Sequence, residues 1–557
     1  MTDYRIRHVK CDETKPTCRK CAKSDWKCDG YAETPAAKGS KAAQKQLVPK
    51  PGRSTSSASA SPSPASSVVN LLPTNSRFQN DREYRYFKIF CDETAVQLSG
   101  FFDSTLWEDL ILKACEIEPP IRHAAIAIGA INFHSNEESI SEAQMRRELA
   151  FREYSIAISQ IWHSISKGTH DLRVTLMACL LFACFELFTD YPESAAGQIS
   201  AGIRMIEDWY RHPDHPVIDP SCITSPNPWV VEDEILQAFG RLELQTTSYA
   251  DSRAARVHIA HHRCGNLPFE VIPMVFSNLK EARIYLDVIM RQTMHYEASL
   301  ENPAEYEGLA LQNENFFSPF QNSHDQYEKI MESYQHWLEA FTPVWETAHS
   351  PEGGHLLLGA ASLRLTFLSS HLSHATLSGD PAIHDGRFDD ELSQIITLAN
   401  IIIANSPIPN RPETCISLEG RLSIPLTTVI LRYRNRRLRS GALDILAQQP
   451  RREGVWNTQL LGKCLEWING LEEDGLDADL EVVPENRITR DFSWHFNPET
   501  RSIDLRAMVP SLDIPGHFTE QQGSVPRPSS NSPGRPDSWQ TGRHNFEFES
   551  WANGHFS

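Results

Sequence analysis

The chain has 557 residues, of which 40% are hydrophobic, so it can bury the core of one large domain or two smaller ones. Its net charge of −19 is uneven: residues 1–53 carry thirteen Lys or Arg against six Asp or Glu, a balance of +7, which leaves −26 for the other 504 residues. Only the amino-terminal end is suited to approach phosphates, and the acidic remainder argues against nucleic-acid binding elsewhere.

Neither a membrane span nor a secretory signal is expected. The longest strongly apolar run, residues 174–185, is too short to cross a bilayer, and the amino terminus is polar and basic. Eight cysteines are dispersed along the body and are typical of free buried thiols in a reducing compartment. They are Cys91, Cys115, Cys179, Cys184, Cys222, Cys264, Cys415 and Cys464. We expect a protein that is soluble and intracellular and has no membrane partner.

Four further cysteines lie together within the first 28 residues, inside a basic string. The candidate zinc ligands are Cys11, Cys18, Cys21 and Cys28, spaced C-x6-C-x2-C-x6-C. Clustered thiolates of this kind in an intracellular chain indicate zinc rather than disulfides. The basic residues around them are Arg5, Arg7, His8 and Lys10, followed by Arg19, Lys20 and Lys23.

These residues resemble the fungal Zn2Cys6 binuclear-cluster transcription factors, whose pattern is C-x2-C-x6-C-x5-12-C-x2-C-x6-8-C. The last four cysteines of that pattern are present, with the flanking Lys10-Cys11-Asp12, Pro16 and Gly30-Tyr31. The first two cysteines would fall at Met1 and Tyr4 and are absent. A gene start placed after a lost upstream exon is one explanation, and a natural loss of the half-site is the other.

The missing cysteines change what the resemblance implies for the metal. In the family six thiolates hold two zinc ions, so that Cys18 would bridge, Cys11 would serve one ion, and Cys21 and Cys28 the other. Four thiolates would leave one ion with two protein ligands and the other with three, and neither is a closed tetrahedral site. The alternatives are one four-thiolate zinc site, or a segment without metal that stays unfolded.

The resemblance also implies contacts with double-stranded DNA. Arg5, Arg7, His8 and Lys10 would read or grip a short GC-rich half-site in the major groove, with Arg19, Lys20 and Lys23 nearer the phosphates. His8 stands where relatives often carry Lys or Arg. A homodimer and transcription coactivators are further partners that the family suggests, but no heptad run follows the cluster to support a coiled coil.

The segments that follow differ sharply in composition. Residues 1–31 are the partial zinc module, and residues 32–76 form a linker rich in Ser, Ala, Pro and Lys that is expected to be disordered. Residues 77–508 have helical periodicity almost throughout. Helix starts are predicted at Pro119 and at the Ser139 capping box, with further helices at 172–188, 194–210, 230–245, 277–300, 325–347, 354–375, 388–405, 422–439 and 456–472. Alternating aromatic residues near 492–505 predict a small β-hairpin, and residues 509–557 are expected to be a disordered tail.

This body resembles the fungal-specific regulatory domain that follows Zn2Cys6 clusters. The matching stretches are Tyr86-Phe87, 98–103, 120–124, 178–186, 450–456 and 484–490. The resemblance implies an all-α domain that modulates transcription through small metabolites or partners. The predicted fold is therefore a large all-α regulatory domain with a small carboxy-terminal β-hairpin, preceded by a small truncated zinc-cluster module.

Evidence for other chemistry is weak. His261, His262 and Cys264 with Cys222 could be imagined as a metal site, but chance adjacency is the better explanation among 22 histidines. The sequence contains no H-E-x-x-H, G-x-S-x-G, P-loop or G-x-G-x-x-G motif, so no enzyme is expected. Five arginines between 432 and 439 are expected to complement a helix dipole or to face solvent.

The sequence thus predicts a nuclear, zinc-dependent, sequence-specific DNA-binding regulator of transcription by RNA polymerase II. The alternative is a helical ligand-sensing or protein-interaction regulator that has lost DNA binding. The sequence of the transcript's 5′ end would distinguish the two.

Overall fold

The structure is a computed structural model, and it divides the chain into two units, residues 1–74 and 75–557. All described residues belong to the second unit. They are residues 77–133, 138–211, 224–250, 253, 257–258, 271–300, 323–377, 388–405, 416–419, 422–448, 450–497, 500, 502–511, 514 and 517–526. The predicted zinc module and linker lie outside these residues.

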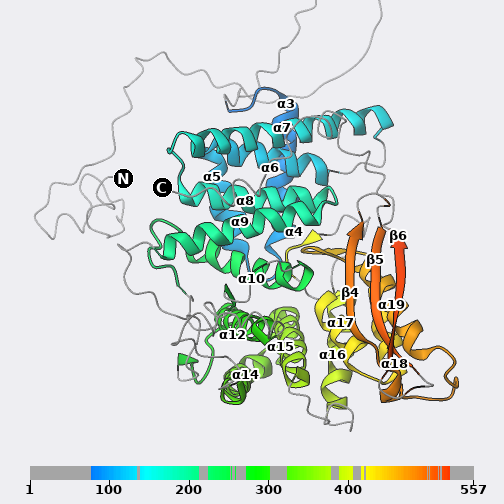
Figure 1. Cartoon of the computed structure of the whole chain (residues 1–557). Coiled ribbons are helices and arrows are strands. Elements are labelled where there is room, and N and C mark those ends of the chain that lie inside the picture. The colour runs from blue at the N-terminus through cyan, green and yellow to red at the C-terminus, as the bar shows by residue number, and fades with distance from the viewer. Residues whose placement is uncertain are drawn as a thin grey trace, which may run out of the picture. The chain divides into compact units, whose positions relative to one another are not determined.

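The first helices of this unit pack on one another mainly through α6 and α8, in the upper part of Figure 1. They are α3 (Asp81–Ile89), α4 (Ala95–Ser99), α5 (Ile111–Ile117), α6 (Pro119–Asn132), α7 (Ile140–Ser166), α8 (Leu172–Phe188), α9 (Pro192–Tyr210) and α10 (Asp233–Ala250), with π-helical turns at Phe90–Thr94 and Thr105–Leu110. Pro119 occupies the first turn of α6, and Ser139 with Glu142 forms the capping box of α7. Both predicted helix starts are confirmed.

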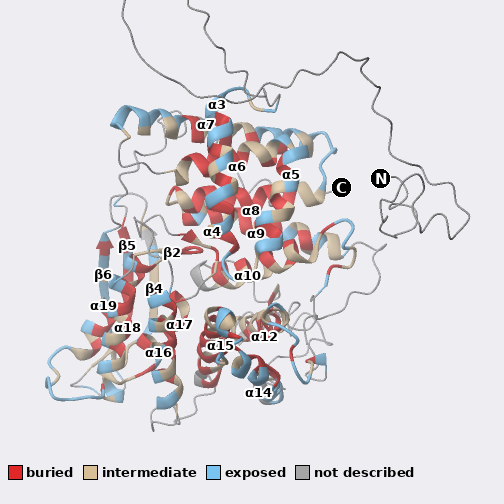
Figure 2. Ribbon diagram, turned by 180° about the vertical axis from the view of Figure 1, so that it is seen from behind, coloured by how far each residue is buried: buried red, intermediate tan, exposed pale blue. Residues whose placement is uncertain are grey.

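Helix α8 is buried within this group because its sequence is apolar on every side. The prediction of a buried helix over 172–188 is confirmed, and Figure 2 shows α8 buried along most of its length. Phe182 and Phe185 of α8 contact the ring of Tyr154 on α7, and the Tyr154 hydroxyl donates to the buried carboxylate of Glu186 at 2.5 Å. Among the described helices, none combines the length and the apolar character that crossing a membrane requires.

The later helices follow below this group in Figure 1. They are α12 (Leu279–Leu300), α14 (Ser323–Ala348), α15 (Leu357–Leu377), α16 (Asp389–Asn405), α17 (Ser423–Arg432), α18 (Arg436–Gln448) and α19 (Thr458–Glu473), with 3-10 turns at Gly354–Leu356 and Glu485–Arg487. Trp337 of α14 joins three of them: its ring stacks on Phe367 of α15 with centroids 5.2 Å apart, and its Nε1 donates to the carbonyl of Ala282 on α12 at 2.7 Å. The predicted all-α domain is confirmed.

The predicted single helix over 422–439 is wrong. Helix α17 ends at Arg432, and the chain is extended at Tyr433 before α18 begins at Arg436. The extended stretch pairs with residues 481–483, since the N–H of Val483 donates to the carbonyl of Arg434 and the N–H of Arg436 to the carbonyl of Glu481. The Asn435 side chain then accepts from the N–H of Leu438, so that it caps α18.

A small sheet connects the two groups of helices. Strand β1 (Ile416–Ser417) pairs in parallel with β2 (Arg452–Glu453), which pairs antiparallel with β3 (Trp456–Asn457). Gln97 of α4 donates to the carbonyl of Ile416 at 3.1 Å, and Gln245 of α10 donates to the carbonyl of Leu418 at 2.5 Å. These hydrogen bonds from a side chain to a backbone carbonyl join segments that are more than 150 residues apart in sequence.

The second sheet contains the predicted hairpin and one further strand. Strands β4 (Arg490–Asn497), β5 (Ser502–Pro510) and β6 (Phe518–Pro526) run antiparallel in the order β4-β5-β6 and pack on α19. A side chain at Gly523 of β6 would overlap the Trp467 ring of α19, which explains the glycine at this close approach. The hairpin is confirmed, but β6 lies inside the segment 509–557 expected to be a disordered tail, so that expectation is wrong for residues 518–526.

Candidate functional site

The residues predicted to bind zinc and DNA all lie outside the described part of the chain. They are Cys11, Cys18, Cys21 and Cys28 for the metal, and Arg5, Arg7, His8, Lys10, Arg19, Lys20 and Lys23 for DNA. The suspected His261, His262, Cys264 and Cys222 group also lies outside it. Whether these residues suit zinc can still be judged from the number and type of their donor atoms. Four thiolates match the tetrahedral preference of one zinc ion, but they are fewer than the ligands that two ions require.

Within the described residues, no three His, Cys, Asp or Glu side chains are grouped so that they could hold a metal ion. The five described cysteines of the body are free thiols, four of them buried: Cys91, Cys115, Cys179, Cys184 and Cys464. Burial raises the pKa of Cys91 to about 11 and the pKa values of Cys179 and Cys464 to about 12. Such thiols stay protonated at neutral pH and are poor nucleophiles, as expected of structural rather than reactive cysteines.

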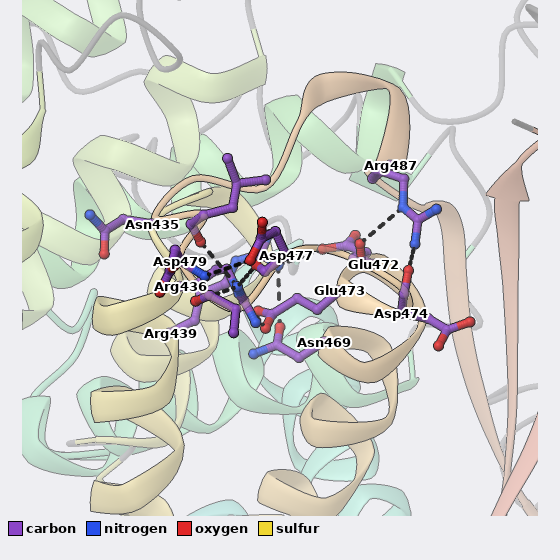
Figure 3. A network of polar contacts seen from close by, with 12 residues as sticks. Asn435, Arg436, Arg439, Asn469, Glu472, Glu473, Asp474, Asp477, Asp479 and Arg487 are labelled. Carbon is purple, nitrogen blue, oxygen red and sulfur yellow. Dashed lines mark hydrogen bonds and ion pairs between the residues drawn. The ribbon is translucent and has the colours of Figure 1, made fainter.

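The arginine run at 432–439 is divided: Arg432, in the last turn of α17, and Arg437 are exposed as expected, whereas Arg436 and Arg439 are not. Arg439 is fully buried and donates to the Glu472 carboxylate at 2.6 Å and to the carbonyl of Tyr433. Arg436 stands at the start of α18, where the helix dipole disfavours a cation, and it pairs with Glu473 at 2.9 Å. Figure 3 shows both arginines directed toward the acidic end of α19.

The same network extends to the start of the second sheet. Glu472 accepts from the backbone N–H and from the hydroxyl of Thr489, both at 2.8 Å. Arg487 donates to the carbonyls of Glu472 and Asp474, as Figure 3 shows. These contacts hold α18, α19 and the residues just before β4 together, so this part of the arginine run stabilises the fold and is not available to bind nucleic acid.

A second buried charge cluster surrounds Glu243 on α10. Its carboxylate contacts Arg253 at 2.5 Å, Arg291 at 2.7 Å and His295 at 3.5 Å. Burial alone would raise the pKa of Glu243, but Arg291, His295 and Arg253 together hold it well below its usual value. The carboxylate is therefore ionised at neutral pH and holds α10 to α12.

A third cluster joins Asp103 to Arg241 at 2.9 Å and to Arg283 at 3.3 Å, and Arg283 also contacts Glu419 at 3.0 Å. Burial lowers the pKa of the Arg283 guanidinium, but Glu419 and Asp103 outweigh it and raise that pKa. Each of these clusters pairs acids with arginines, the arrangement of structural ion-pair networks rather than of an acid–base catalytic pair.

Comparison with known proteins identifies a similar domain for the amino-terminal segment, which lies outside the described residues. Residues 5–38 match the fungal Zn(2)-Cys(6) binuclear cluster domain, and this span contains all four clustered cysteines. The aspercryptin biosynthesis cluster-specific transcription regulator atnN of Emericella nidulans is 29% identical over 221 residues, 36% of this chain and 33% of that protein. The transcription regulator lscL of Purpureocillium lilacinum is 27% identical over 226 residues, 38% of this chain and 49% of that protein. The chain thus spans between 33% and 49% of these relatives' lengths, and no solved structure matches it.

Proposed function

Because residues 5–38 match the fungal Zn(2)-Cys(6) binuclear cluster domain and both relatives are transcription regulators, we propose that the chain is a sequence-specific DNA-binding transcription regulator. The match over the clustered cysteines is the observation that carries the proposal. The described domain is the regulatory part of the molecule, its site of action is the nucleus, and its targets are genes transcribed by RNA polymerase II. No catalytic activity is proposed.

The binuclear cluster domain is a zinc-binding domain, and Cys11, Cys18, Cys21 and Cys28 are the proposed ligands. Four thiolates complete one tetrahedral zinc site, whereas two ions would need further ligands. When bound, zinc supplies the free energy that orders a module too small to bury a core of its own. The thiolates of this chain hold the metal, and the basic residues before and between them approach the DNA.

For the DNA contacts we propose two groups of side chains. Arg5, Arg7, His8 and Lys10 precede or adjoin the first ligand and reach the base edges of a GC-rich half-site, where arginine and lysine donate to the acceptors of guanine. Arg19, Lys20 and Lys23 surround the Cys-x-x-Cys pair and contact phosphates, which position the module without reading sequence.

The helical body is proposed to regulate rather than to bind DNA. The residues after position 53 carry a net charge of −26, which repels the phosphate backbone. Arg436 and Arg439, which could have formed a basic face, are held by Glu473 and Glu472. Coactivators and a second copy of the chain are the partners proposed for this body.

The alternative function is a helical regulator that senses a ligand or a partner protein and does not bind DNA. The absence of cysteines at Met1 and Tyr4 is the observation that favours it. The two functions differ in one measurable property, the affinity of the zinc-loaded chain for a GC-rich duplex.

That affinity is measured by fluorescence anisotropy with a labelled GC-rich duplex and the full zinc-loaded chain at several salt concentrations. We expect binding that weakens steeply with salt, since each phosphate contact contributes about −0.9 to the slope of log affinity against log salt. Lys23→Gln should lower the slope by about one. Arg7→Gln should weaken binding to the GC-rich duplex more than to an AT-rich one.

Lys167→Gln is the matched control. Lys167 is an exposed lysine at the end of α7, and its substitution removes the same charge from the chain as Lys23→Gln does. It should leave both affinity and slope unchanged. If the chain does not bind DNA even with Met1→Cys and Tyr4→Cys behind an added initiator, the DNA-binding function is refuted. Binding only after this restoration would assign the alternative function to the chain as written.

A further inference from the structure

A cavity of about 450 Å³ lies beside α17 in the described domain. Its walls come from four places: α15, the whole length of α17, the β3–α19 region and strand β4. The lining residues of α17 run from Ser423 to Arg432, so the cavity follows that helix for about 14 Å at the usual rise per residue. Both its volume and its composition are those of small-molecule sites.

One wall of the cavity is aromatic. Trp456 of β3 and Trp494 of β4 meet edge to face with ring centroids 5.1 Å apart, and Phe492 meets Trp494 in the same way at 5.3 Å. Edge-to-face rings present flat apolar surfaces to whatever lies between them and α17. This wall therefore favours a planar apolar group.

The part of that wall supplied by β4 follows a bulge in the strand. The pairing of β4 with β5 shifts register between Arg490 and Ser493, and Asp491 has a φ of 49°. Phe492 and Trp494 are two residues apart and so lie on one face of β4 beside the cavity, and Ser493 between them also borders it. The network around Glu472 fixes the preceding Thr489, so the bulge starts from an anchored residue.

The opposite wall carries hydroxyl groups whose protons are already used. Thr427 donates to the carbonyl of Ser423 at 2.7 Å, and Thr428 donates to the carbonyl of Ile424 at 3.1 Å. The Ser423 hydroxyl donates to Glu453 at 2.8 Å. These groups offer lone pairs to a ligand but few donors, so they do not by themselves bind an anion.

The charge in the cavity comes from Arg432. Among the described residues that line the cavity it is the one charged side chain, and it is exposed and forms no ion pair with a described residue. Its neighbours in the run differ, since Arg436 and Arg439 are neutralised by Glu473 and Glu472. At the other end of α17 the backbone N–H groups of Leu422 and Ser423 are occupied by Glu453.

We propose that this cavity binds a planar organic anion, with the apolar rings of the ligand against Trp456, Phe492 and Trp494 and its acidic group on Arg432. The cavity has one aromatic wall and one uncompensated cation at one end, so a carboxylate or sulfonate attached to an aromatic system satisfies both features. The ligand would touch α15, α17 and β4 at once and so tie the second sheet to the helices. This site is independent of whether the amino-terminal segment binds DNA.

The experiment compares two probes of the same shape on the full chain. Anilinonaphthalene sulfonate is an aromatic anion with a planar naphthalene ring, and phenylnaphthylamine is its neutral counterpart; both become fluorescent in apolar sites. Fluorescence titration should show tighter binding of the anion. Arg432→Gln should weaken the anion about tenfold, the loss expected for one charge-assisted hydrogen bond, and leave the neutral probe unchanged.

Arg437→Gln is the matched control, because Arg437 is an exposed arginine of the same run that does not line the cavity. Two blocking variants act from opposite walls: Thr427→Phe from α17 and Ser493→Trp from β4. Each should abolish binding of both probes while the thermal unfolding midpoint shows that the chain is folded. A folded blocking variant that retains both probes, or equal effects of Arg432→Gln and Arg437→Gln, would overturn the proposal.

Discussion

Substituting Arg439 by methionine tests the buried network between α18 and α19 most directly. The Arg439 side chain is 1% exposed and its Glu472 partner 4%, so the substitution leaves a carboxylate buried without its cation. Breaking a buried pair in this way costs about 3–5 kcal/mol of the free energy of unfolding. Thr489 still donates its N–H and its hydroxyl to Glu472, which places the expected cost near the lower end, at about 3 kcal/mol.

Arg436→Met is the control for this measurement. Arg436 pairs with Glu473 on the same two helices and also donates to the carbonyls of Asp477, Ala478 and Leu480. The Arg436 and Glu473 side chains are 25% and 22% exposed, so the loss should be smaller than that for Arg439→Met. A further variant, Arg439→Met with Glu472→Gln, removes the unpaired charge while an amide oxygen still accepts from Thr489. It should recover part of the loss.

Both comparisons use urea unfolding of the full chain, followed by the helical circular dichroism signal, with the slope of unfolding free energy against urea checked for constancy. If Arg439→Met destabilises the chain no more than Arg436→Met does, burial does not control the strength of this network and the reasoning is wrong. A double variant less stable than Arg439→Met alone would contradict it in the same way.

Further predictions concern the metal, pH and the helical core. Elemental analysis should find at most one zinc per chain, because four thiolates are available, and two after Met1→Cys and Tyr4→Cys; two in the unmodified chain would contradict the ligand count. Glu243→Gln should destabilise the domain at neutral pH, and because the folded-state pKa of Glu243 is lowered, the difference from the unmodified chain should vanish in acid unfolding curves as pH falls through that pKa. Phe182→Asp should abolish folding by burying an unpaired charge in α8, as seen by circular dichroism. His261→Ala should leave reporter activation intact; its loss in a folded protein would reveal chemistry that the sequence does not show.

Hydrophobic periodicity predicted most helices of the body, because a helix that buries one face must repeat apolar residues at helical spacing. The run at 172–188 and the capping box at Ser139 are found where the sequence places them. Periodicity failed at 422–439 because apolar residues on both sides of Tyr433 continue the pattern across a break. The break is made by pairing with residues 481–483, although Asn435, a good helix cap, was a local signal for it.

The zinc module and the cavity also differ in whether the sequence alone could predict them. Ligand spacing and basic residues were sufficient to indicate the zinc module, since its chemistry lies within one short segment. The cavity could not be predicted, because Thr427, Trp456 and Trp494 become neighbours only when α17, β3 and β4 pack together. Strand β6 was missed because its residues are mostly polar, and only its pairing with β5 and the Gly523–Trp467 contact fix it in place.

The junction between the two groups of helices constrains how this chain can change during evolution. Gln97 and Gln245 bind the carbonyls of Ile416 and Leu418, which every residue type possesses. Substitutions at 416 and 418 therefore preserve these hydrogen bonds, whereas one inserted or deleted residue between them would carry a carbonyl out of reach. Homologous chains should keep a constant spacing between these two positions, with apolar residue types at both because Ile416 and Leu418 are buried.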